Sequence, residues 1–284
     1  MLPRFEYRSF KELDKALEFI AEYEDVKPLA GGTDLVVQMR AGKIRPKHVV
    51  DIEPISDLNY IQEEDGVLRI GALTKIEDIR RSRLVKMYAP SLWLATQEIA
   101  TWQVRCAATL GGNLSNASPA ADTATPLIAL KAEAVLKSKS GERSVPLDEF
   151  FTSPGITVMR SDELLVEVKV PKPGEGTRHN FLKLGRRTTH VLSIVNVALM
   201  VELDGEVAKD VRVALGSVAP KPVRAKSVEE ALRGKAVTSG LAKEASSKVV
   251  NDISPITDVR ATKEYRLEMS KVLTFRAIKE VMKW

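Results

Sequence analysis

Hydrophobic and polar residues repeat along this chain with two different periods, which together predict a mixed α and β structure. Residues 9–23 place Leu13, Leu17 and Ile20 on one face, so they predict an amphipathic helix capped by Ser9. Residues 26–32 predict a short buried strand that runs into a glycine turn. Residues 34–42 predict a helix closed by Gly42, and residues 47–52 predict a second strand. A strand, a helix and a strand in this order indicate a right-handed parallel unit.

The middle of the chain predicts a larger set of elements. Strands are predicted over residues 66–74 and 163–171, and helical structure over residues 76–100 with an interruption before Pro90. Residues 132–151 predict a strand, a turn, a strand and a short helix. Residues 171–178 hold two prolines and two glycines in a short polar run, which predicts a linker.

After this linker the pattern changes to three strands followed by helices. The strands are predicted over residues 180–187, 192–203 and 209–218, with a hairpin turn at Asp204–Gly205. Residues 227–284 predict helices, with a break around residues 253–258. We therefore expect a domain boundary near residue 175.

Composition limits the possible function classes. A chain of 284 residues favours about two domains. The net charge is +5, and lysines and arginines are spread along the whole length, so the sequence does not indicate a nucleic-acid-binding patch. No apolar run approaches the length of a membrane span, and the N-terminus lacks the apolar segment of a signal peptide. We expect a cytoplasmic protein.

The chain is also poor in metal-binding side chains. With one cysteine and three histidines it cannot build a four-thiolate iron–sulfur cluster or a structural zinc site by itself. Cys106 cannot form a disulfide within the chain, and we expect it to be a small buried residue.

Two glycine pairs are the main candidates for chemistry: Gly31–Gly32 in LAGGTDL and Gly111–Gly112 in TLGGNLSN. A glycine pair permits positive φ and lets a ligand approach the backbone amides without a Cβ in the way. Consecutive amides that point the same way bind anions such as a diphosphate. For either pair taken alone, a simple tight turn is the favoured interpretation. Neither stretch has the GxGxxG or GxxxxGK[ST] pattern, so a Rossmann site, a kinase and an NTPase are not supported.

Taken together, LAGGTDLVVQMR and QVRCAATLGGNLSNASPAAD resemble the two flavin-diphosphate loops of the FAD-binding medium subunits of molybdenum hydroxylases. This family includes xanthine dehydrogenases, carbon monoxide dehydrogenases and archaeal glyceraldehyde oxidoreductases. The resemblance covers the whole chain. It implies an α+β fold: a FAD-binding domain of the vanillyl-alcohol-oxidase (PCMH) type over residues 1–175, followed by a small α+β domain over residues 176–284 with an antiparallel sheet and helices. The first domain would divide into subdomains of about residues 1–55 and 56–175, with FAD between them.

The resemblance also implies which residues bind non-covalent FAD. The first loop would contribute Leu29, Ala30, Gly31, Gly32, Thr33, Asp34 and Leu35. The second loop would contribute Thr109, Leu110, Gly111, Gly112 and Asn113, and three further positions are Asp122, Leu165 and Lys183. In the family, the carboxylate at the position of Asp122 accepts hydrogen bonds from flavin hydroxyls, and Leu165 and Lys183 approach the isoalloxazine ring. Cys106, Ala107 and Ala108 differ from the residues usual in the family, which affects the expected backbone path just before Thr109.

Several of these residues have a second interpretation from local chemistry. We expect Asp34 to turn its amide toward the phosphate and its side chain toward the following helix as an N-cap. Asp122 is either the flavin ligand or the N-cap of the helix that begins near residue 123. Trp93 and Trp102 are expected in the core rather than stacked on the flavin, and His190 either lies on the surface or approaches the ring.

By the same resemblance, this chain would carry electrons and would contain no catalytic residue of its own. A large subunit with molybdopterin would oxidise the substrate, a small subunit with two [2Fe–2S] clusters would deliver electrons to the FAD, and an external acceptor would receive them. The assembly would be a heterotrimer or a dimer of heterotrimers. Two alternatives are a self-sufficient FAD-dependent oxidoreductase of the same fold and a scaffold that has lost FAD. The substrate and the final acceptor cannot be read from this chain.

Overall fold

The N-terminal part of the chain is a three-stranded parallel sheet covered by two helices. The computed structural model describes residues 2–187 and 190–284. The strands lie in the order β1-β3-β2. They and their helices are β1 (Glu6–Ser9), α1 (Leu13–Glu22), β2 (Val26–Leu29), α2 (Leu35–Arg40) and β3 (His48–Asp51), followed by the 3₁₀ helix η1 (Ser56–Leu58). The parallel pairing of β2 with β3 confirms the predicted strand–helix–strand unit.

One local prediction in this part is wrong, and one strand was not predicted. Ser9 does not cap the first helix, because it ends β1 and its hydroxyl donates to Asp51 at 3.2 Å. The helix begins four residues later, after Glu12. The sequence does not predict β1. All its residues are exposed, so its sequence shows no alternation of apolar and polar positions. The predicted role of Gly42 is confirmed: it follows α2 with a φ of 71°.

The central part is built on a five-stranded antiparallel sheet in the order β4-β5-β10-β6-β7. The strands are β4 (Ile61–Glu64), β5 (Val67–Gly71), β6 (Glu133–Ser138), β7 (Gly141–Pro146) and β10 (Leu164–Pro171). The central strand β10 is buried over almost its whole length, as its apolar sequence LLVEVKV predicts. A separate small hairpin pairs β8 (Phe151–Ser153) with β9 (Ile156–Thr157).

Helices between β5 and β8 cover this sheet and carry the second glycine stretch. They are α3 (Ile76–Arg81), α4 (Arg83–Tyr88), α5 (Pro90–Glu98), α6 (Trp102–Ala107), α7 (Leu110–Ser115), α8 (Ala124–Ala129) and α9 (Leu147–Phe150). The break predicted before Pro90 separates α4 from α5, because proline starts a helix well but cannot continue one.

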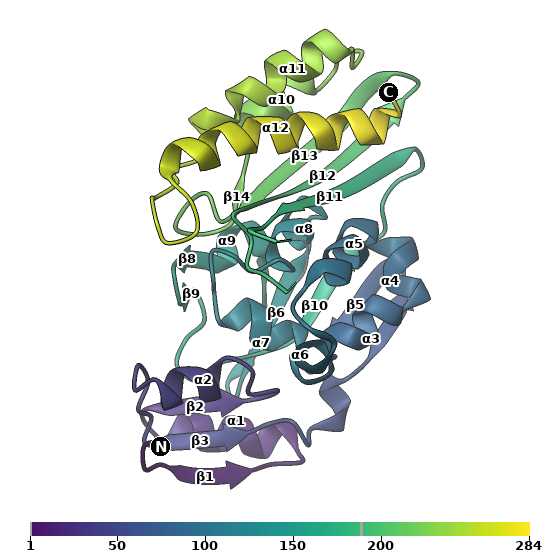
Figure 1. Cartoon of the computed structure of the whole chain (residues 1–284). Coiled ribbons are helices and arrows are strands. Elements are labelled where there is room, and N and C mark those ends of the chain that lie inside the picture. Colours follow the sequence, from purple (N-terminus) through teal and green to yellow (C-terminus); the bar gives the residue numbers. More distant parts are fainter. Residues whose placement is uncertain (1, 188–189) are drawn as a thin grey trace.

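The C-terminal part is a four-stranded antiparallel sheet in the order β11-β12-β13-β14 with helices on one face (Figure 1). Its elements are β11 (Thr177–Leu184), β12 (Val195–Asp204), β13 (Val207–Gly216), β14 (Val223–Arg224), α10 (Lys226–Leu232), α11 (Ser239–Ser247), the 3₁₀ helix η2 (Lys248–Asn251) and α12 (Lys263–Met282). The hairpin between β12 and β13 turns at Gly205, as predicted. The predicted boundary near residue 175 falls in the connection between β10 and β11.

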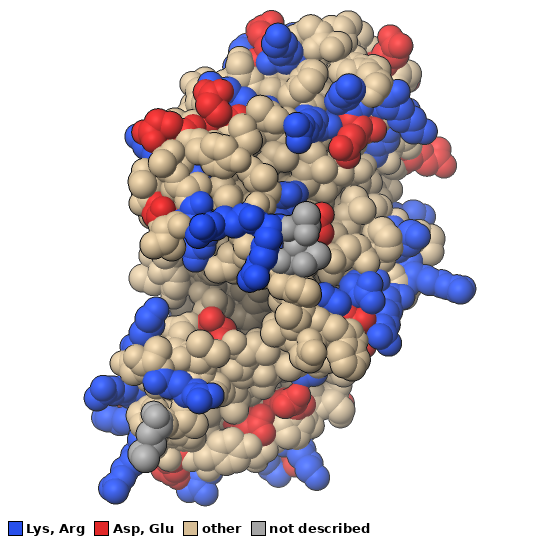
Figure 2. All heavy atoms as spheres, viewed as in Figure 1, with Lys and Arg blue, Asp and Glu red and all other residues tan. Residues whose placement is uncertain are grey.

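The two faces of the C-terminal sheet are buried against different partners. One face packs on the helices α10–α12 and forms its own core with Val197, Leu199 and Val213. The other face contributes Phe181, Ala198 and Ala214 to the core of the central part. In the space-filling view, the surface is hollowed between the N-terminal part and the rest of the molecule, with lysine and arginine side chains along the upper edge (Figure 2). No helix within the described residues is both long and apolar enough to cross a membrane.

Candidate cofactor site

The first glycine stretch leaves a row of backbone amides without partners. It connects β2 to α2, and Gly32 has a φ of 67° there, a value that glycine adopts readily. Among the described residues, no backbone or side-chain group accepts a hydrogen bond from the amides of residues 31–35, and the first amide of this turn that is bonded is Val36, which donates to the carbonyl of Gly32 at 3.3 Å. These amides are therefore available to an anion, as the sequence predicted.

The side chain of Asp34 does not make the hydrogen bond that was expected. It occupies the N-cap position of α2, but its carboxylate accepts no hydrogen bond from the helix amides. The carboxylate instead accepts a hydrogen bond from the Gln38 side chain, one turn along the helix. The predicted capping role is wrong, and the free helix amides are left to other partners.

The second glycine stretch differs from the first, because its amides are already bonded. The amide of Leu110 donates to the Thr74 carbonyl at 3.0 Å, and the amide of Gly111 donates to the Ala72 carbonyl at 2.8 Å. The hydroxyl of Thr109 caps α7 by accepting from the Gly112 amide at 3.1 Å. The amide of Asn113 donates to the Thr109 carbonyl at 3.0 Å. The expectation of a second row of free amides is therefore wrong: this stretch is a fixed helical turn.

Neither glycine of the second stretch has a positive φ, and only Gly111 is closely packed. A Cβ at Gly111 would lie 2.7 Å from the Cβ of Ala72, whereas a Cβ at the exposed Gly112 would meet only the Thr109 hydroxyl oxygen, at 2.9 Å. Gly112 thus presents bare backbone to solvent. Nearby, Asn113 accepts a hydrogen bond from the hydroxyl of Thr123 at 2.6 Å, so its amide group is held in one orientation.

The two stretches, far apart in the sequence, lie against each other. A Cβ at Gly31 would come within 1.8 Å of the Ala107 carbonyl oxygen, so the first loop rests on the last residue of α6, two residues before Thr109. The side chain of Gln38 also donates to Asn116 at 3.2 Å. The structure therefore brings the two predicted loops into one site.

Asp122 lies at the contact between the central part and the C-terminal sheet, with 7% of its surface exposed. Its carboxylate accepts hydrogen bonds from Lys183 Nζ at 2.7 Å, from Asn196 Nδ2 at 2.7 Å and from the hydroxyl of Ser193. The N-cap interpretation of Asp122 is wrong, because Thr123 occupies that position of α8 and no side chain caps the helix.

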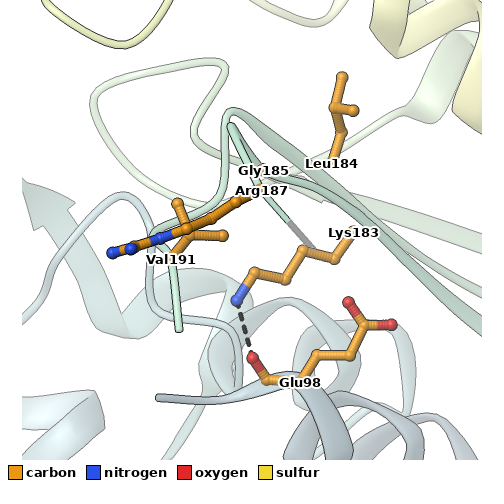
Figure 3. Close-up of a pocket in the computed structure, with 6 residues that line it drawn as sticks. All are labelled: Glu98, Lys183, Leu184, Gly185, Arg187 and Val191. Atoms are coloured by element: carbon orange, nitrogen blue, oxygen red, sulfur yellow. Dashed lines mark hydrogen bonds between the residues drawn. The ribbon is translucent and has the colours of Figure 1, made fainter. Parts of the chain in front are cut away.

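Lys183 joins this cluster to a pocket of about 280 Å³. The pocket is lined by Glu98, Lys183, Leu184, Gly185, Arg187 and Val191. The Lys183 ammonium donates to the backbone carbonyl of Glu98 at 3.1 Å, at the end of α5 (Figure 3). Burial raises the pKa of the Glu98 carboxyl; the Lys183 charge opposes this rise, and the Asp122 carboxylate adds to it. The pocket therefore combines two cationic side chains, Lys183 and Arg187, with a carboxyl group whose pKa is raised.

The remaining predicted residues have mixed outcomes. Leu165 lies in β10 within the core of the central part, apart from the residues that line the pocket. Trp93 packs on that core and donates from Nε1 to the Arg80 carbonyl at 2.9 Å, whereas Trp102 is 55% exposed, so the core prediction is wrong for Trp102. Cys106 is exposed, which contradicts the expectation of a buried residue, and His190 lies on the surface.

Sequence reasoning missed Glu98, Ser193 and Asn196. Asn196 could have been noticed, since it is a single amide within the apolar strand sequence SIVNVAL and must find a partner when buried. Glu98 and Ser193 give no comparable signal. No group of three histidine, cysteine, aspartate or glutamate side chains suited to a metal ion occurs in the part of the chain that the structure describes.

These features fit the group that the sequence resemblance implies. A diphosphate needs several donors, and the bare turn at residues 31–35 supplies amides that nothing else in the described chain satisfies. A flavin ring presents carbonyl oxygens, and the ammonium of Lys183 lies in a pocket with Arg187 as a second cation. The donor set therefore fits FAD.

Comparison with known proteins agrees with this fit. Residues 3–173 match the family described as the FAD binding domain in molybdopterin dehydrogenase, and residues 180–281 match the CO dehydrogenase flavoprotein C-terminal domain. The glyceraldehyde dehydrogenase medium chain of Sulfolobus acidocaldarius is 37% identical, over 98% of this chain and 99% of that protein. The xanthine dehydrogenase FAD-binding subunit of Escherichia coli O157:H7 is 32% identical, over 97% of this chain and 95% of that protein.

Solved structures give the same result for the fold. A carbon monoxide dehydrogenase from Hydrogenophaga pseudoflava, which lacks the Mo-pyranopterin moiety of its cofactor, contains a chain that superimposes with a TM-score of 0.97. That chain is 33% identical, and the alignment covers 100% of this chain and 99% of the other. The predicted α+β fold, with an antiparallel sheet and helices at its C-terminal end, is confirmed.

Proposed function

Because the chain belongs to the family of FAD-binding subunits of the molybdopterin dehydrogenases, an oxidoreductase family, we propose that it is the electron-transferring flavoprotein subunit of a heteromeric molybdenum hydroxylase. In this proposal a small partner subunit with [2Fe–2S] clusters supplies electrons, and an external acceptor receives them. A large partner subunit with molybdopterin oxidises the substrate. FAD, when bound, supplies the redox chemistry, because its ring both accepts and donates electrons.

The observation that carries the proposal is the row of unpartnered amides at residues 31–35, packed against the stretch that begins at Thr109. These amides would bind the FAD diphosphate, with Thr33 and Asn113 offering side-chain donors. Leu29, Ala30 and Leu35 flank this loop, and Leu110, Gly111 and Gly112 form the facing wall. Because the amides of the facing wall are already bonded within the chain, we assign it the task of shaping the site.

The flavin ring would lie toward the pocket that Lys183 lines. Lys183 would donate to an acceptor atom of the ring, and Asp122 would hold Lys183 in place. A fixed positive charge beside the ring stabilises added negative charge, so this chain would favour reduction of the flavin. Leu165 would contribute from the core of the central part. We further propose that residues 1–175 form the FAD-binding domain, with subdomains of about residues 1–55 and 56–175, and that residues 176–284 form the C-terminal domain.

Reconstitution tests this proposal. The purified chain alone should bind FAD that a chemical reductant reduces, and acid should release all of the flavin because the binding is non-covalent. It should not oxidise an aldehyde or a purine. Substrate-dependent bleaching of the flavin absorption should appear only after both partner subunits are added. Turnover of an aldehyde or a purine by the isolated chain would favour a self-sufficient oxidoreductase of the same fold instead.

A further inference from the structure

The carboxylate of Asp122 is enclosed by donors from the C-terminal sheet. A carboxylate offers about four acceptor positions. Three donors reach it: Lys183 Nζ on one oxygen, and Asn196 Nδ2 together with the Ser193 hydroxyl on the other. All three donors come from residues 61 to 74 positions later in the sequence. The orientation of Asp122 is therefore set by the C-terminal part of the chain and not by its own helix.

Asn196 is itself held in a single orientation. Its carbonyl oxygen accepts a hydrogen bond from the Thr125 hydroxyl at 2.8 Å, and its amide nitrogen donates to Asp122 at 2.7 Å. A flipped amide would break both bonds, because donor and acceptor would exchange places. Asn196 is fully buried and packs so closely on Gly216 that a Cβ at Gly216 would lie 2.5 Å from its carbonyl oxygen. Close packing and two hydrogen bonds thus leave Asn196 no alternative position.

Lys183 connects the Asp122 cluster to the pocket, because it contacts Asp122 and also lines the pocket. An ammonium group has three N–H donors, and two are used, toward Asp122 and toward the carbonyl of Glu98. The side chain is only 3% exposed, yet it lines the pocket, so one donor remains for a bound group. The ammonium is thereby held between Asp122 and the end of α5, where it donates to the Glu98 carbonyl at the pocket lining (Figure 3).

We propose that Asn196 and Ser193 are positioning residues of the FAD site. They hold Asp122 so that its carboxylate fixes the Lys183 ammonium beside the flavin ring. This inference rests on the proposed function, since it requires FAD at this site. It assigns the C-terminal sheet a direct part in binding the cofactor. Loss of either positioning side chain leaves Asp122 with fewer hydrogen bonds, so that the Asp122–Lys183 pair can shift away from the ring without the loss of any group that touches FAD.

Ser193→Ala and Asn196→Ala test the inference in the full-length chain. Titration with FAD, followed by quenching of flavin fluorescence, measures the dissociation constant, and a redox titration measures the midpoint potential of the bound flavin. We expect the dissociation constant to rise about tenfold in Asn196→Ala, the low end of the range for residues that orient metal-binding side chains. In Ser193→Ala, which removes one hydrogen bond to Asp122, we expect a rise of about threefold. The midpoint potential should become more negative, because the cation no longer stays beside the ring. Ser193→Thr, which keeps the hydroxyl, should restore both values.

Lys221→Met is the matched control. Lys221 also links the C-terminal part to the central part, by donating to the Phe151 carbonyl at 2.9 Å. Within the described residues it is not among the hydrogen-bond donors to Asp122, which are Lys183, Ser193 and Asn196. The control should lower the melting temperature yet leave the dissociation constant and the midpoint potential of bound FAD unchanged.

Three results would overturn the inference. In the first, the dissociation constant and the midpoint potential of bound FAD both stay at the wild-type values in Ser193→Ala. This variant removes a single oxygen atom, so its result is sufficient even if Asn196→Ala fails to fold. In the second, Lys221→Met weakens FAD binding as much as Ser193→Ala does, which would reduce the network to general docking of the two parts. In the third, the wild-type chain binds no FAD, which would also contradict the proposed function and is thereby distinguishable from the other two.

Discussion

Gly31 lies so close to Ala107 that the two backbones are in direct contact. A Cβ built at Gly31 would be 1.8 Å from the Ala107 carbonyl oxygen and 2.5 Å from the carbonyl carbon, distances that no side chain tolerates. The contact joins the loop after β2 to the end of α6. It holds the first loop, with its free amides, against the segment that leads from α6 to α7.

Gly31→Ala should therefore disrupt the site. The methyl group can be accommodated only if the first loop and α6 move apart, so we expect a loss of about 3 kcal/mol in unfolding free energy and no stoichiometric FAD. Chemical denaturation and the flavin absorption of the purified protein measure the two effects. Gly240→Ala, at an open helical position where a Cβ meets nothing closer than 4.0 Å, is the control and should be neutral or stabilising. Normal FAD content in Gly31→Ala would contradict the packing argument.

Gly112→Ala separates folding from cofactor binding. Gly112 is exposed and helical, and a methyl group there would meet only the Thr109 hydroxyl oxygen. Alanine favours a helix over glycine by about 1 kcal/mol, and this gain offsets the cost of displacing the Thr109 cap hydroxyl, which the new Cβ would meet at 2.9 Å. We therefore expect the melting temperature to stay near that of the wild type. FAD binding should weaken at least about tenfold if the bare backbone faces the cofactor, which corresponds to about 1.4 kcal/mol. Unchanged FAD affinity in the folded variant would show that this glycine only forms a turn.

His179 should make the protein sensitive to acid. It lies on the same face of β11 as Phe181 and Lys183, and neither ring nitrogen has a hydrogen-bond partner among the described residues. Burial lowers the pKa of His179 to about 4 from an ordinary value of 6.5. Between these two values the unfolded chain binds more protons than the folded one, so stability falls as the pH drops from about 6.5 through 4, by at most about 3 kcal/mol.

His179→Leu tests this assignment. The variant places an apolar side chain on the same face of β11 and has no group to protonate at this position. Its unfolding free energy should therefore fall less steeply between pH 6.5 and 4 than that of the wild type. Denaturant titrations at several pH values measure the slope. Identical slopes in the two proteins would assign the acid sensitivity to other groups.

Glu77 holds together the helices that lead to the second glycine stretch. Its buried carboxylate accepts hydrogen bonds from Arg80, Arg81 and Arg105, at 3.0, 2.9 and 2.8 Å respectively. Hydrogen bonds from Arg80, and then from Arg105 and Arg81, lower the pKa of Glu77 to about 2 against the effect of burial. The ionised carboxylate therefore contributes to the unfolding free energy. This contribution is complete above the pKa of Glu77 in the unfolded chain, near 4.5, and it is lost as the pH falls through about 2.

Glu77→Gln should cost about 3 kcal/mol at neutral pH, because it leaves several guanidinium groups around a neutral side chain. The difference in unfolding free energy from the wild type should shrink below pH 4.5, because protonation of Glu77 in the unfolded wild-type chain then destabilises the folded wild type. Glu63→Gln, on the exposed strand β4, serves as the control and should change the unfolding free energy by no more than about 0.5 kcal/mol. A pH-independent difference in Glu77→Gln would mean that packing, and not charge, explains the loss.

Much of the fold follows from patterns that are local in sequence. Four features are as predicted: the apolar run of β10, the break before Pro90, the turn at Gly205 and the parallel unit around β2 and β3. Each of them follows from a pattern within a short stretch of the sequence. The two glycine stretches likewise identified the family, since their composition reflects a backbone that must come close to other atoms.

Only the tertiary structure decided how those stretches are used. The sequence cannot tell that the amides of Leu110 and Gly111 are bonded to Thr74 and Ala72 while those of residues 31–35 stay free, because the acceptors lie on a distant segment. For the same reason the sequence left Asp122 open between a flavin ligand and a helix cap, whereas its partners in the structure are Lys183, Ser193 and Asn196. Cys106 was expected to be buried, but it is exposed on α6. A pattern fixes the backbone near a residue, whereas burial and hydrogen-bond partners depend on which remote surfaces the folded chain brings together.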